Sequence, residues 1–391
     1  MVSEKDSSAR RRCIPRNESA DKIARDFPRD YYVECAKTKT FPKEQWAALA
    51  DAGFLGINTP VEYGGAGLGM LELVLLQERL AEHGVAPLFF VVNQGIAVPS
   101  ISRHGTDEQK ERWLPSIANG EKRCCFAITE PNAGTNTFKI QTVAKEEGDH
   151  FVLNGNKLFI SGIGDAHQVL VVARTSAGGE GKRPGLTLFV VDTDSEGLSW
   201  DTMDTLVSHA EHQYFVYFDE VKVPKENILG KIDGGINVLF DALNPERMVV
   251  AAGAIGGGRH ALKRGVDYAN EREIFKGPIG AYQGLQHPMA EAKALLEAAS
   301  LMIQKAAWLQ DSGEHSKVVG DCANMGKMVG TDAAFKAADA ALQCFGGYGF
   351  TESYDMLSHF ITARLGKVAP INREMTLNYI GEYILGLPKS Y

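Results

Sequence analysis

The sequence has no cysteine pattern that could bind a metal or form a redox pair. Its six cysteines stand at positions 13, 35, 124, 125, 322 and 344, and none of them forms a C-x-x-C pair. No group of histidines has metal-ligand spacing. We therefore expect no metal site and unpaired thiols in a reducing compartment, which is the cytoplasm or, in a eukaryote, the mitochondrial matrix.

The sequence also lacks a long hydrophobic run and a basic tract. No apolar run approaches the ~18 residues that a membrane-spanning helix needs, so we expect no membrane span. The net charge is −8, and the basic cluster at residues 10–12 has acidic residues on both sides. A nucleic acid is therefore not expected as a partner, and the acidic neighbours argue against a transit peptide.

The composition is that of a globular protein with two or three domains. The chain has 391 residues, of which 44% are hydrophobic and 23% are charged, which allows substantial cores. The pattern predicts an N-terminal helical domain (1–122, with 1–20 a loose tail), a middle β domain (123–228) and a C-terminal helical bundle (229–391). Helices are expected at 43–53, 70–84, 283–312, 315–344 and 371–387, and Pro245 is expected to begin a helical segment rather than kink one.

The middle domain is organised around the stretch from Cys125 to Ser161. It contains CFAITEPNAGTN and then VLNGNKLFIS, in which Asn154-Gly155 predicts a hairpin turn between two strands. Hydroxyl groups at the strand ends, a glycine that lets another body approach the backbone, and the aromatic wall of Phe159 could hold a flat heteroaromatic cofactor. An ordinary β-hairpin with a glycine turn is the alternative.

These segments resemble the acyl-CoA dehydrogenase family. Three further blocks follow in the family's order: NPERMVVAAGAIG, YANEREIFKGPIGAYQGLQ and ALQCFGGYGF. The resemblance covers the chain from about residue 40 to the end. It implies an α+β fold with an N-terminal helical domain, a middle domain similar to a β-barrel or β-sandwich, and a C-terminal four-helix bundle. It also implies FAD as cofactor and an acyl-CoA as substrate.

The chemistry implied by the resemblance removes a proton from Cα of the thioester and a hydride from Cβ. The hydride passes to flavin N5, and the product is the trans-2-enoyl-CoA. The base is a carboxylate that works best when burial raises its pKa. Many family members carry it in a C-terminal E-G-T motif. Counting without gaps from Gly349, those three positions are Pro370, Ile371 and Asn372, so that base is missing.

A second position for the base is known in the isovaleryl- and long-chain types, which place it in an E-R pair followed by apolar and small residues. The segment ERMVVAAGAIG matches this pattern, and the resemblance therefore implies Glu246 as the base. Arg247 points about 100° away on a helix and would meet the CoA phosphates. The structural alternative is a solvated helix face. Glu374 is a rival base, whereas Glu130 is expected to be structural.

The resemblance also assigns cofactor contacts by register. Thr129 would lie near the pyrimidine edge of the flavin, Ser161 near N5, and Phe159 would replace the usual tryptophan wall. Arg272 would pair with the pyrophosphate, and Thr135 would also approach the acyl-CoA. The implied cofactor-binding residues are Phe126, Ile128, Thr129, Gly134, Thr135, Phe159, Ser161, Arg272, Phe275, Gln283, Gln343, Gly346, Gly347 and Asn372.

Arg272 and Phe275 resemble residues that reach the FAD of a neighbouring subunit, which implies a homotetramer built from two dimers. The implied electron acceptor is an electron-transfer flavoprotein. Three alternatives stay open: an acyl-CoA oxidase, an enoyl-CoA reductase, and a catalytically silent FAD-binding subunit of a mixed oligomer. The sequence does not indicate whether the acyl group is short, long, branched or cyclic.

Overall fold

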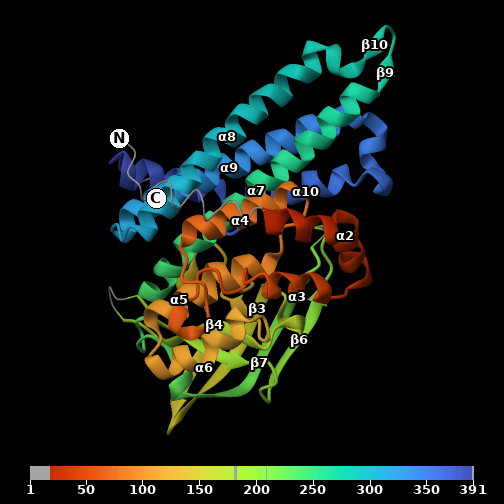
Figure 1. Cartoon of the computed structure of the whole chain (residues 1–391). Helices are drawn as coiled ribbons and strands as arrows, with labels where there is room; N and C mark the ends of the chain where they lie inside the picture. The colour runs from red at the N-terminus through yellow and green to blue at the C-terminus, as the bar shows by residue number, and fades with distance from the viewer. Residues whose placement is uncertain (1–17, 180–182, 208, 390–391) are drawn as a thin grey trace.

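The chain folds as helices, then strands, then helices, which confirms the predicted α+β class (Figure 1). The computed structural model describes residues 18–179, 183–207 and 209–389. The strands gather on one side of the N-terminal helices, and the long C-terminal helices extend away from them on the other side. Among the described residues, no helix is long and apolar enough to cross a membrane.

The N-terminal part is helical, as predicted. Residues 18–26 are helical, so the loose tail expected over 1–20 is wrong for 18–20, and its first 17 residues lie outside the described part. The predicted helices at 43–53 and 70–84 are confirmed by α3 and α4. The elements are α2 (Arg29–Thr38), α3 (Lys43–Asp51), η1 (Val61–Tyr63), α4 (Met70–Glu82), the π-helix η2 (Phe90–Ala97), α5 (Val98–His104) and α6 (Asp107–Ala118).

The middle part is one bent sheet of eight strands in the order β6-β7-β3-β2-β4-β5-β8, with β1 paired to β4. The strands are β1 (Cys124–Ala127), β2 (Val143–Glu147), β3 (His150–Ser161), β4 (Gln168–Ser176), β5 (Gly185–Asp192), β6 (Leu198–Met203), β7 (Gln213–Pro224) and β8 (Ile228–Leu229). Its two halves enclose a core in which the rings of Phe151 (β3) and Phe189 (β5) lie 5.3 Å apart. A sheet that closes on its own core in this way is similar to a barrel.

The hairpin predicted at Asn154-Gly155 is wrong. Strand β3 runs straight through this pair, and the turn between β2 and β3 lies at Gly148-Asp149 instead. Gly155 has φ +146° and sits at a β-bulge against β7. Asn154 bridges to that strand, since its Nδ2 donates to Glu220 Oε1 at 2.7 Å and its Oδ1 accepts from Glu220 N at 3.0 Å. The Asn-Gly pair therefore makes a bulge rather than a turn.

The C-terminal part is a bundle of long helices, as predicted. It contains α7 (Gly235–Glu271), the short hairpin β9 (Glu273–Ile274) and β10 (Gly277–Pro278), α8 (Gln283–Asp311), α9 (Ser316–Phe345), α10 (Met356–Gly366), α11 (Arg373–Tyr379) and the π-helix η9 (Ile380–Ile384). Helix α10 was not predicted. Pro245 lies inside α7 and begins no segment, because burial of this helix on several sides outweighs the one backbone hydrogen bond that a proline removes.

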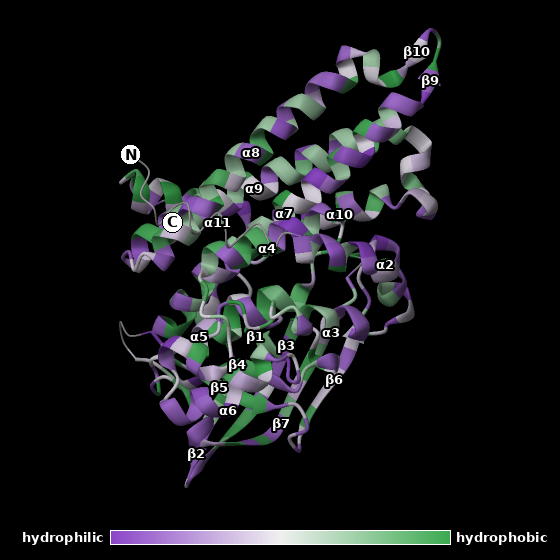
Figure 2. Cartoon of the chain, viewed as in Figure 1, coloured by the Kyte–Doolittle hydropathy of each residue, from purple (hydrophilic) through white to green (hydrophobic). Residues whose placement is uncertain are grey.

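Helices α7 and α9 run in the same direction and touch through small residues. A methyl group on Gly320 would lie 3.2 Å from Asn244 Oδ1, and one on Gly330 would lie 3.7 Å from Ala251 Cβ. Hydrophobic residues are concentrated in the strands and the helices beside them, whereas α8 alternates between hydrophilic and hydrophobic residues (Figure 2). Because α7 and α9 approach closely through small residues, side chains on the faces between them are shielded from water.

Candidate active site

Glu246 is a buried carboxylate on α7. Only 9% of the residue is exposed, and among the described residues 18–179, 183–207 and 209–389 no hydrogen bond or ion pair involves its side chain. The π-helix η2 runs against this turn of α7, since a methyl group on Gly95 would lie 3.6 Å from Glu246 Cα. Burial raises the pKa of Glu246 to about 7, although the charges of Arg247 and Lys327 act in the opposite direction. Such a carboxylate can accept a proton near neutral pH.

Arg247 makes no ion pair or hydrogen bond with Glu246 in the described part of the chain, although its charge lowers the pKa of that carboxyl against the effect of burial. Its Nη1 donates to Asn244 Oδ1 at 3.0 Å, and Asn244 in turn donates to Ser316 O at 3.2 Å, so the guanidinium is directed toward the start of α9. Burial lowers the pKa of Arg247, while Glu246 and Tyr379 raise it. The alternative of a solvated helix face is wrong, because both residues are buried.

Lys327 on α9 is a third charged residue of this interior, and the sequence did not single it out. It is 1% exposed, and its Nζ donates to Gly366 O and Ile371 O, both at 2.7 Å. Burial lowers the pKa of Lys327 to about 8, and the Glu246 carboxylate opposes that shift. The signal in the sequence was a lysine within the run of mostly small residues CANMGKMVGTDAA. Small residues are typical of a helix face that packs closely on another helix, and a lysine on such a face needs a partner because lysine is almost never fully buried without one.

The segment that replaces the E-G-T motif lies between α10 and α11. Asn372 begins α11, where its Oδ1 accepts from Met375 N at 2.8 Å, and its Nδ2 donates to Thr135 Oγ1 at 3.2 Å. Two predicted site residues from the middle and C-terminal parts of the chain are therefore in contact. The rival base Glu374 is exposed in the first turn of α11, whereas Glu246 is buried.

Glu130 is fully engaged in the fold. Its carboxylate accepts from Lys157 Nζ at 2.8 Å, Gln141 N at 2.6 Å and Thr142 N at 2.9 Å. Burial alone would raise the pKa of Glu130, but the Lys157 charge and these hydrogen bonds lower it. Glu130 is therefore a structural carboxylate, as expected, and it fixes the chain beyond Thr129.

The residues expected to line a flavin ring lie at the ends of β1 and β3. Phe126 ends up largely buried in β1, and Thr129 O accepts from Leu158 N at 3.0 Å. Phe159 has φ +57° at a bulge of β3 and is 57% exposed. Ser161 Oγ accepts from Gln213 Nε2 at 2.9 Å. The positive φ of Phe159 is a strained conformation that leaves its ring exposed. An exposed ring close in sequence to the Ser161 hydroxyl could contact one face of a flat cofactor.

The residues expected at the pyrophosphate lie at the far end of the bundle, beside the β9–β10 hairpin (Figure 1). Arg272, Gly346 and Gly347 line one pocket of about 540 Å³, and no atom lies within 4 Å of where a side chain on Gly347 would begin. A guanidinium facing open glycine backbone suits a diphosphate. Gln283 and Gln343 are exposed nearby in sequence but do not line this pocket. Phe275 is 96% exposed at the hairpin tip.

Gly134 stands open beside Thr135, with no atom within 4 Å of where a side chain would begin. Ile128 is half-buried, and its carbonyl accepts from Lys157 Nζ at 3.0 Å. No group of His, Cys, Asp and Glu within the described residues could hold a metal ion.

Comparisons with known proteins agree with this architecture. Models of the acyl-CoA dehydrogenase N-terminal, middle and C-terminal domains match residues 16–121, 125–221 and 233–385. The chain is 44% identical over 367 residues to acyl-CoA dehydrogenase fadE12 of Mycobacterium tuberculosis (strain CDC 1551 / Oshkosh), covering 94% of each chain. It is 35% identical over 347 residues to a 3-(aryl)acrylate reductase of Clostridium sporogenes, covering 86% of this chain and 90% of that one.

A solved structure shares the fold and contains the reduced cofactor. Glutaryl-CoA dehydrogenase from Mycobacterium smegmatis in complex with FADH2 superposes with a TM-score of 0.85 at 26% identity, covering 96% of each chain. The cofactor of this chain is FAD as well. Because three domain models match most of its length and a relative is 44% identical over 94% of it, the chain belongs to the acyl-CoA dehydrogenase family of FAD-dependent oxidoreductases.

Proposed function

We propose that this protein dehydrogenates an acyl-CoA thioester to the trans-2-enoyl-CoA, with Glu246 as the base that removes the α proton. The observation that carries the proposal is the burial of the Glu246 carboxylate without a hydrogen-bond partner in the described residues, which raises its pKa to about 7. The α proton of a thioester is weakly acidic, so the base must be strong yet ionised at the working pH. A pKa near neutrality meets both conditions.

The family's other base position supports the same assignment. Pro370, which the ungapped count places at the E-G-T glutamate, has no group that could take a proton. Asn372, at the threonine position, contacts Thr135 instead. We propose that this contact closes the side of the site opposite Glu246 and that Thr135 lies near the acyl thioester.

The chain's own residues would orient the cofactor. FAD, when bound, supplies the acceptor for the hydride that leaves Cβ. We propose that Phe126, Ile128, Thr129, Gly134, Phe159 and Ser161 hold the ring and that Arg272, Phe275, Gln283, Gln343, Gly346 and Gly347 hold the rest. The hydroxyl of Ser161 is already oriented by Gln213, which reduces the ordering cost of binding.

The two groups of cofactor residues lie at separate places in one molecule (Figure 1). Strand β3 lies in the sheet. The Arg272 pocket is next to β9, which lies at the end of the bundle away from the sheet. This separation supports the proposal that a neighbouring copy completes each FAD site, in a homotetramer built as a pair of dimers. Arg247 remains our candidate for the CoA phosphates, and an electron-transfer flavoprotein our candidate for the electron acceptor.

The test is the change Glu246→Gln, which keeps the shape of the side chain and removes the base. We expect the yellow FAD spectrum to persist. The rate of flavin bleaching by acyl-CoA near roughly 450 nm, where oxidised flavins absorb, should fall by about 10²–10⁴-fold, the usual contribution of a general base. The matched control is Glu374→Gln, which should bleach at the wild-type rate. Near-normal bleaching in Glu246→Gln would remove Glu246 as the base.

Reduction of an α,β-unsaturated acyl group is the second candidate, because one relative is named a 3-(aryl)acrylate reductase. Glu246 could serve either direction, since a carboxyl group with a pKa of about 7 gives up a proton as readily as it takes one near neutral pH. Reduced protein mixed anaerobically with enoyl-CoA and oxidised protein mixed with acyl-CoA would distinguish them. Reoxidation by enoyl-CoA with no bleaching by any acyl-CoA would favour the reductase.

A further inference from the structure

Lys327 is a charged residue buried in the interior of the helical bundle. It lies on the interior face of α9 among glycines and alanines and is 1% exposed. Removing an ammonium group from water costs several kcal/mol unless hydrogen bonds and an opposite charge compensate it. The two bonds to Gly366 O and Ile371 O satisfy two of its three N–H donors.

These two carbonyl groups come from both sides of the turn between α10 and α11. By bonding Gly366, the last residue of α10, and Ile371, just before Asn372, Lys327 joins the two ends of this connection. Arg373 Nε also donates to Asp332 Oδ2 of α9 at 2.8 Å, one turn beyond Lys327. The connection that carries Asn372 toward Thr135 is therefore fastened to α9, and Lys327 is its buried attachment.

The direction of the helices brings the same ammonium group toward Glu246. Gly320 packs on Asn244, and Gly258 of α7 packs on Ala334 of α9, so Lys327 begins between one and two turns further along the bundle than Glu246. Side chains on both helices lean toward the N-terminus, and the lysine side chain is longer than that of Glu246. The ammonium group of Lys327 is therefore within electrostatic reach of the Glu246 carboxylate.

The charges that face this pair come from α7 and α9. Arg247 and Lys327 both lower the Glu246 pKa against the effect of burial. For Lys327, Glu246 and Asp332 favour the charged form and Arg247 disfavours it. Arg247 is committed to Asn244, whereas Lys327 keeps one N–H donor beyond the hydrogen bonds found in the described part of the chain.

We propose that Lys327 is a positioning residue of the Glu246 site: its ammonium group fastens the chain from 366 to 371 over the site and keeps a positive charge near the Glu246 carboxylate. The inference rests on the proposed function only in that Glu246 is the base. Its two parts make different predictions, since fastening depends on hydrogen-bond donors and the second part depends on charge.

Three substitutions separate donors from charge. Lys327→Arg keeps both, Lys327→Gln keeps N–H donors without the charge, and Lys327→Met removes both. The matched control is Lys336→Met, which removes a lysine of the same helix that pairs with Glu291 at the surface. The measurement on the FAD-loaded protein is the pH dependence of substrate-driven flavin bleaching, together with hydrogen exchange of residues 366–372.

We expect Lys327→Gln and Lys327→Met to raise the pH midpoint of bleaching by about 1 unit, as expected when an opposite charge is removed from a carboxylate. Bleaching at pH 6 should then fall by about tenfold and recover at pH 9. Lys327→Arg and Lys336→Met should keep the wild-type midpoint. Hydrogen exchange of 366–372 should accelerate most in Lys327→Met.

A second readout does not depend on activity. The infrared carbonyl band of protonated Glu246, identified by its loss in Glu246→Gln, gives the Glu246 pKa in protein without substrate. This pKa should rise by the same unit in Lys327→Gln. If Glu246 proved not to be the base, the infrared titration would still test Lys327. A loss of rate that is equal at every pH, with an unchanged infrared pKa of Glu246, would show that Lys327 has a structural role alone. If Lys327→Met does not fold, Lys327→Gln gives the same test.

Discussion

Two buried glutamates of this chain have opposite properties because of their neighbours. Glu130 has a lysine and two backbone N–H groups around it, and its pKa is lowered. Glu246 is buried to a similar degree, and burial raises its pKa to about 7 because no donor in the described residues binds it. A carboxylate left without partners is costly for the fold, and it persists where its reactivity is used.

Glu246→Gln should therefore stabilise the protein at high pH. The folded-state pKa of Glu246 is raised from 4.5 to about 7, so between these pH values the folded protein holds a proton that the unfolded chain has lost. The free energy of unfolding therefore falls as pH rises from 4.5 through about 7. At pH 8 the substitution should raise the free energy of unfolding by on the order of 3 kcal/mol, and at pH 5.5 by roughly 1 kcal/mol. Urea titrations at the two pH values measure this.

The matched change Glu130→Gln should act in the opposite direction. It leaves Lys157, whose side chain is fully buried, without its counter-charge, and should cost about 3–5 kcal/mol. If both substitutions destabilise the protein equally at pH 8, then Glu246 is not the strained carboxylate described here.

The resemblance to acyl-CoA dehydrogenases indicated Glu246, through an E-R pair before small residues and a proline where the other base position falls. The E-R pair alone is equally typical of a solvated helix face. Lys327 was beyond that reasoning, because its role depends on carbonyl groups of Gly366 and Ile371 that only folding brings to α9. The contact between Thr135 and Asn372 is of the same kind. A role that a family motif carries in one short segment can be predicted from such a resemblance, and a role that arises from long-range contacts cannot.

At the scale of elements, periodicity predicted the order of helices and strands but misplaced a turn. An Asn-Gly pair favours a hairpin because both residues tolerate positive φ. Here β7 is a 12-residue strand that pairs along the whole of β3, and this long ladder outweighs the local preference. Helix α10 was missed for a related reason: most of its residues are only half-buried, so no clear apolar stripe marks it in the sequence.

The bulge predicts a sharp difference between two glycines. A methyl group on Gly155 would lie 2.6 Å from Thr142 Cα at a φ of +146°. Gly155→Ala should therefore lower the free energy of unfolding by about 3–5 kcal/mol, from strain and overlap together. Gly148→Ala is the matched control, because Gly148 also has positive φ (+65°) but open space around it, and it should cost only about 1–2 kcal/mol. Equal losses of stability would show that β3 does not bulge at Gly155.

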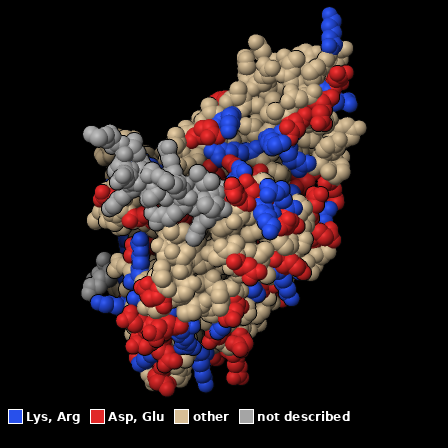
Figure 3. Space-filling view, viewed as in Figure 1, with Lys and Arg blue, Asp and Glu red and all other residues tan. Residues whose placement is uncertain are grey.

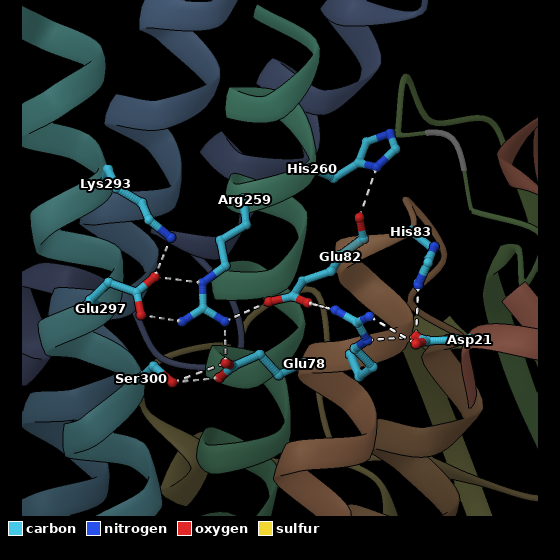
Figure 4. Close-up of polar contacts among 10 residues, drawn as sticks. Asp21, Glu78, Glu82, His83, Arg259, His260, Lys293, Glu297 and Ser300 are labelled. Carbon is cyan, nitrogen blue, oxygen red and sulfur yellow. Dashed lines mark hydrogen bonds and ion pairs between the residues drawn. The ribbon is translucent and has the colours of Figure 1, made fainter. Parts of the chain in front are cut away.

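At the scale of the whole molecule, charged side chains connect the N-terminal helices to the bundle. Arg259 of α7 binds Glu78 and, at 2.6 Å, Glu82 of α4, as well as Glu297 of α8 at 3.1 Å (Figure 4). Glu82 also binds Arg79, which forms an ion pair with Asp21.

Lysine and arginine lie among acidic side chains over the bundle on the face in Figure 3, but most surface pairs contribute little to stability. Arg259 differs because its side chain is only 16% exposed.

Arg259→Met should weaken the junction of α4, α7 and α8. Glu78, which also accepts from Ser300 Oγ at 2.9 Å, would lose its counter-charge, and the free energy of unfolding should fall by about 2–4 kcal/mol at pH 8. Burial already raises the pKa of Glu78 against the opposing charge of Arg259. Without Arg259 that pKa rises further, so Glu78 takes up a proton on acidification, and the loss should be smaller at pH 5.5.

The control for this last change is Lys263→Met, one turn further along α7. Lys263 pairs with Asp267 at the surface, so its removal should change stability by less than about 0.5 kcal/mol at either pH. Denaturant unfolding of the FAD-loaded protein, followed both by flavin release and by circular dichroism, measures all four values. Because Arg259 joins parts of the chain that are far apart in sequence, Arg259→Met should also separate the two transitions. A single transition, with equal losses for both substitutions, would mean that apolar packing alone holds α4 on the bundle.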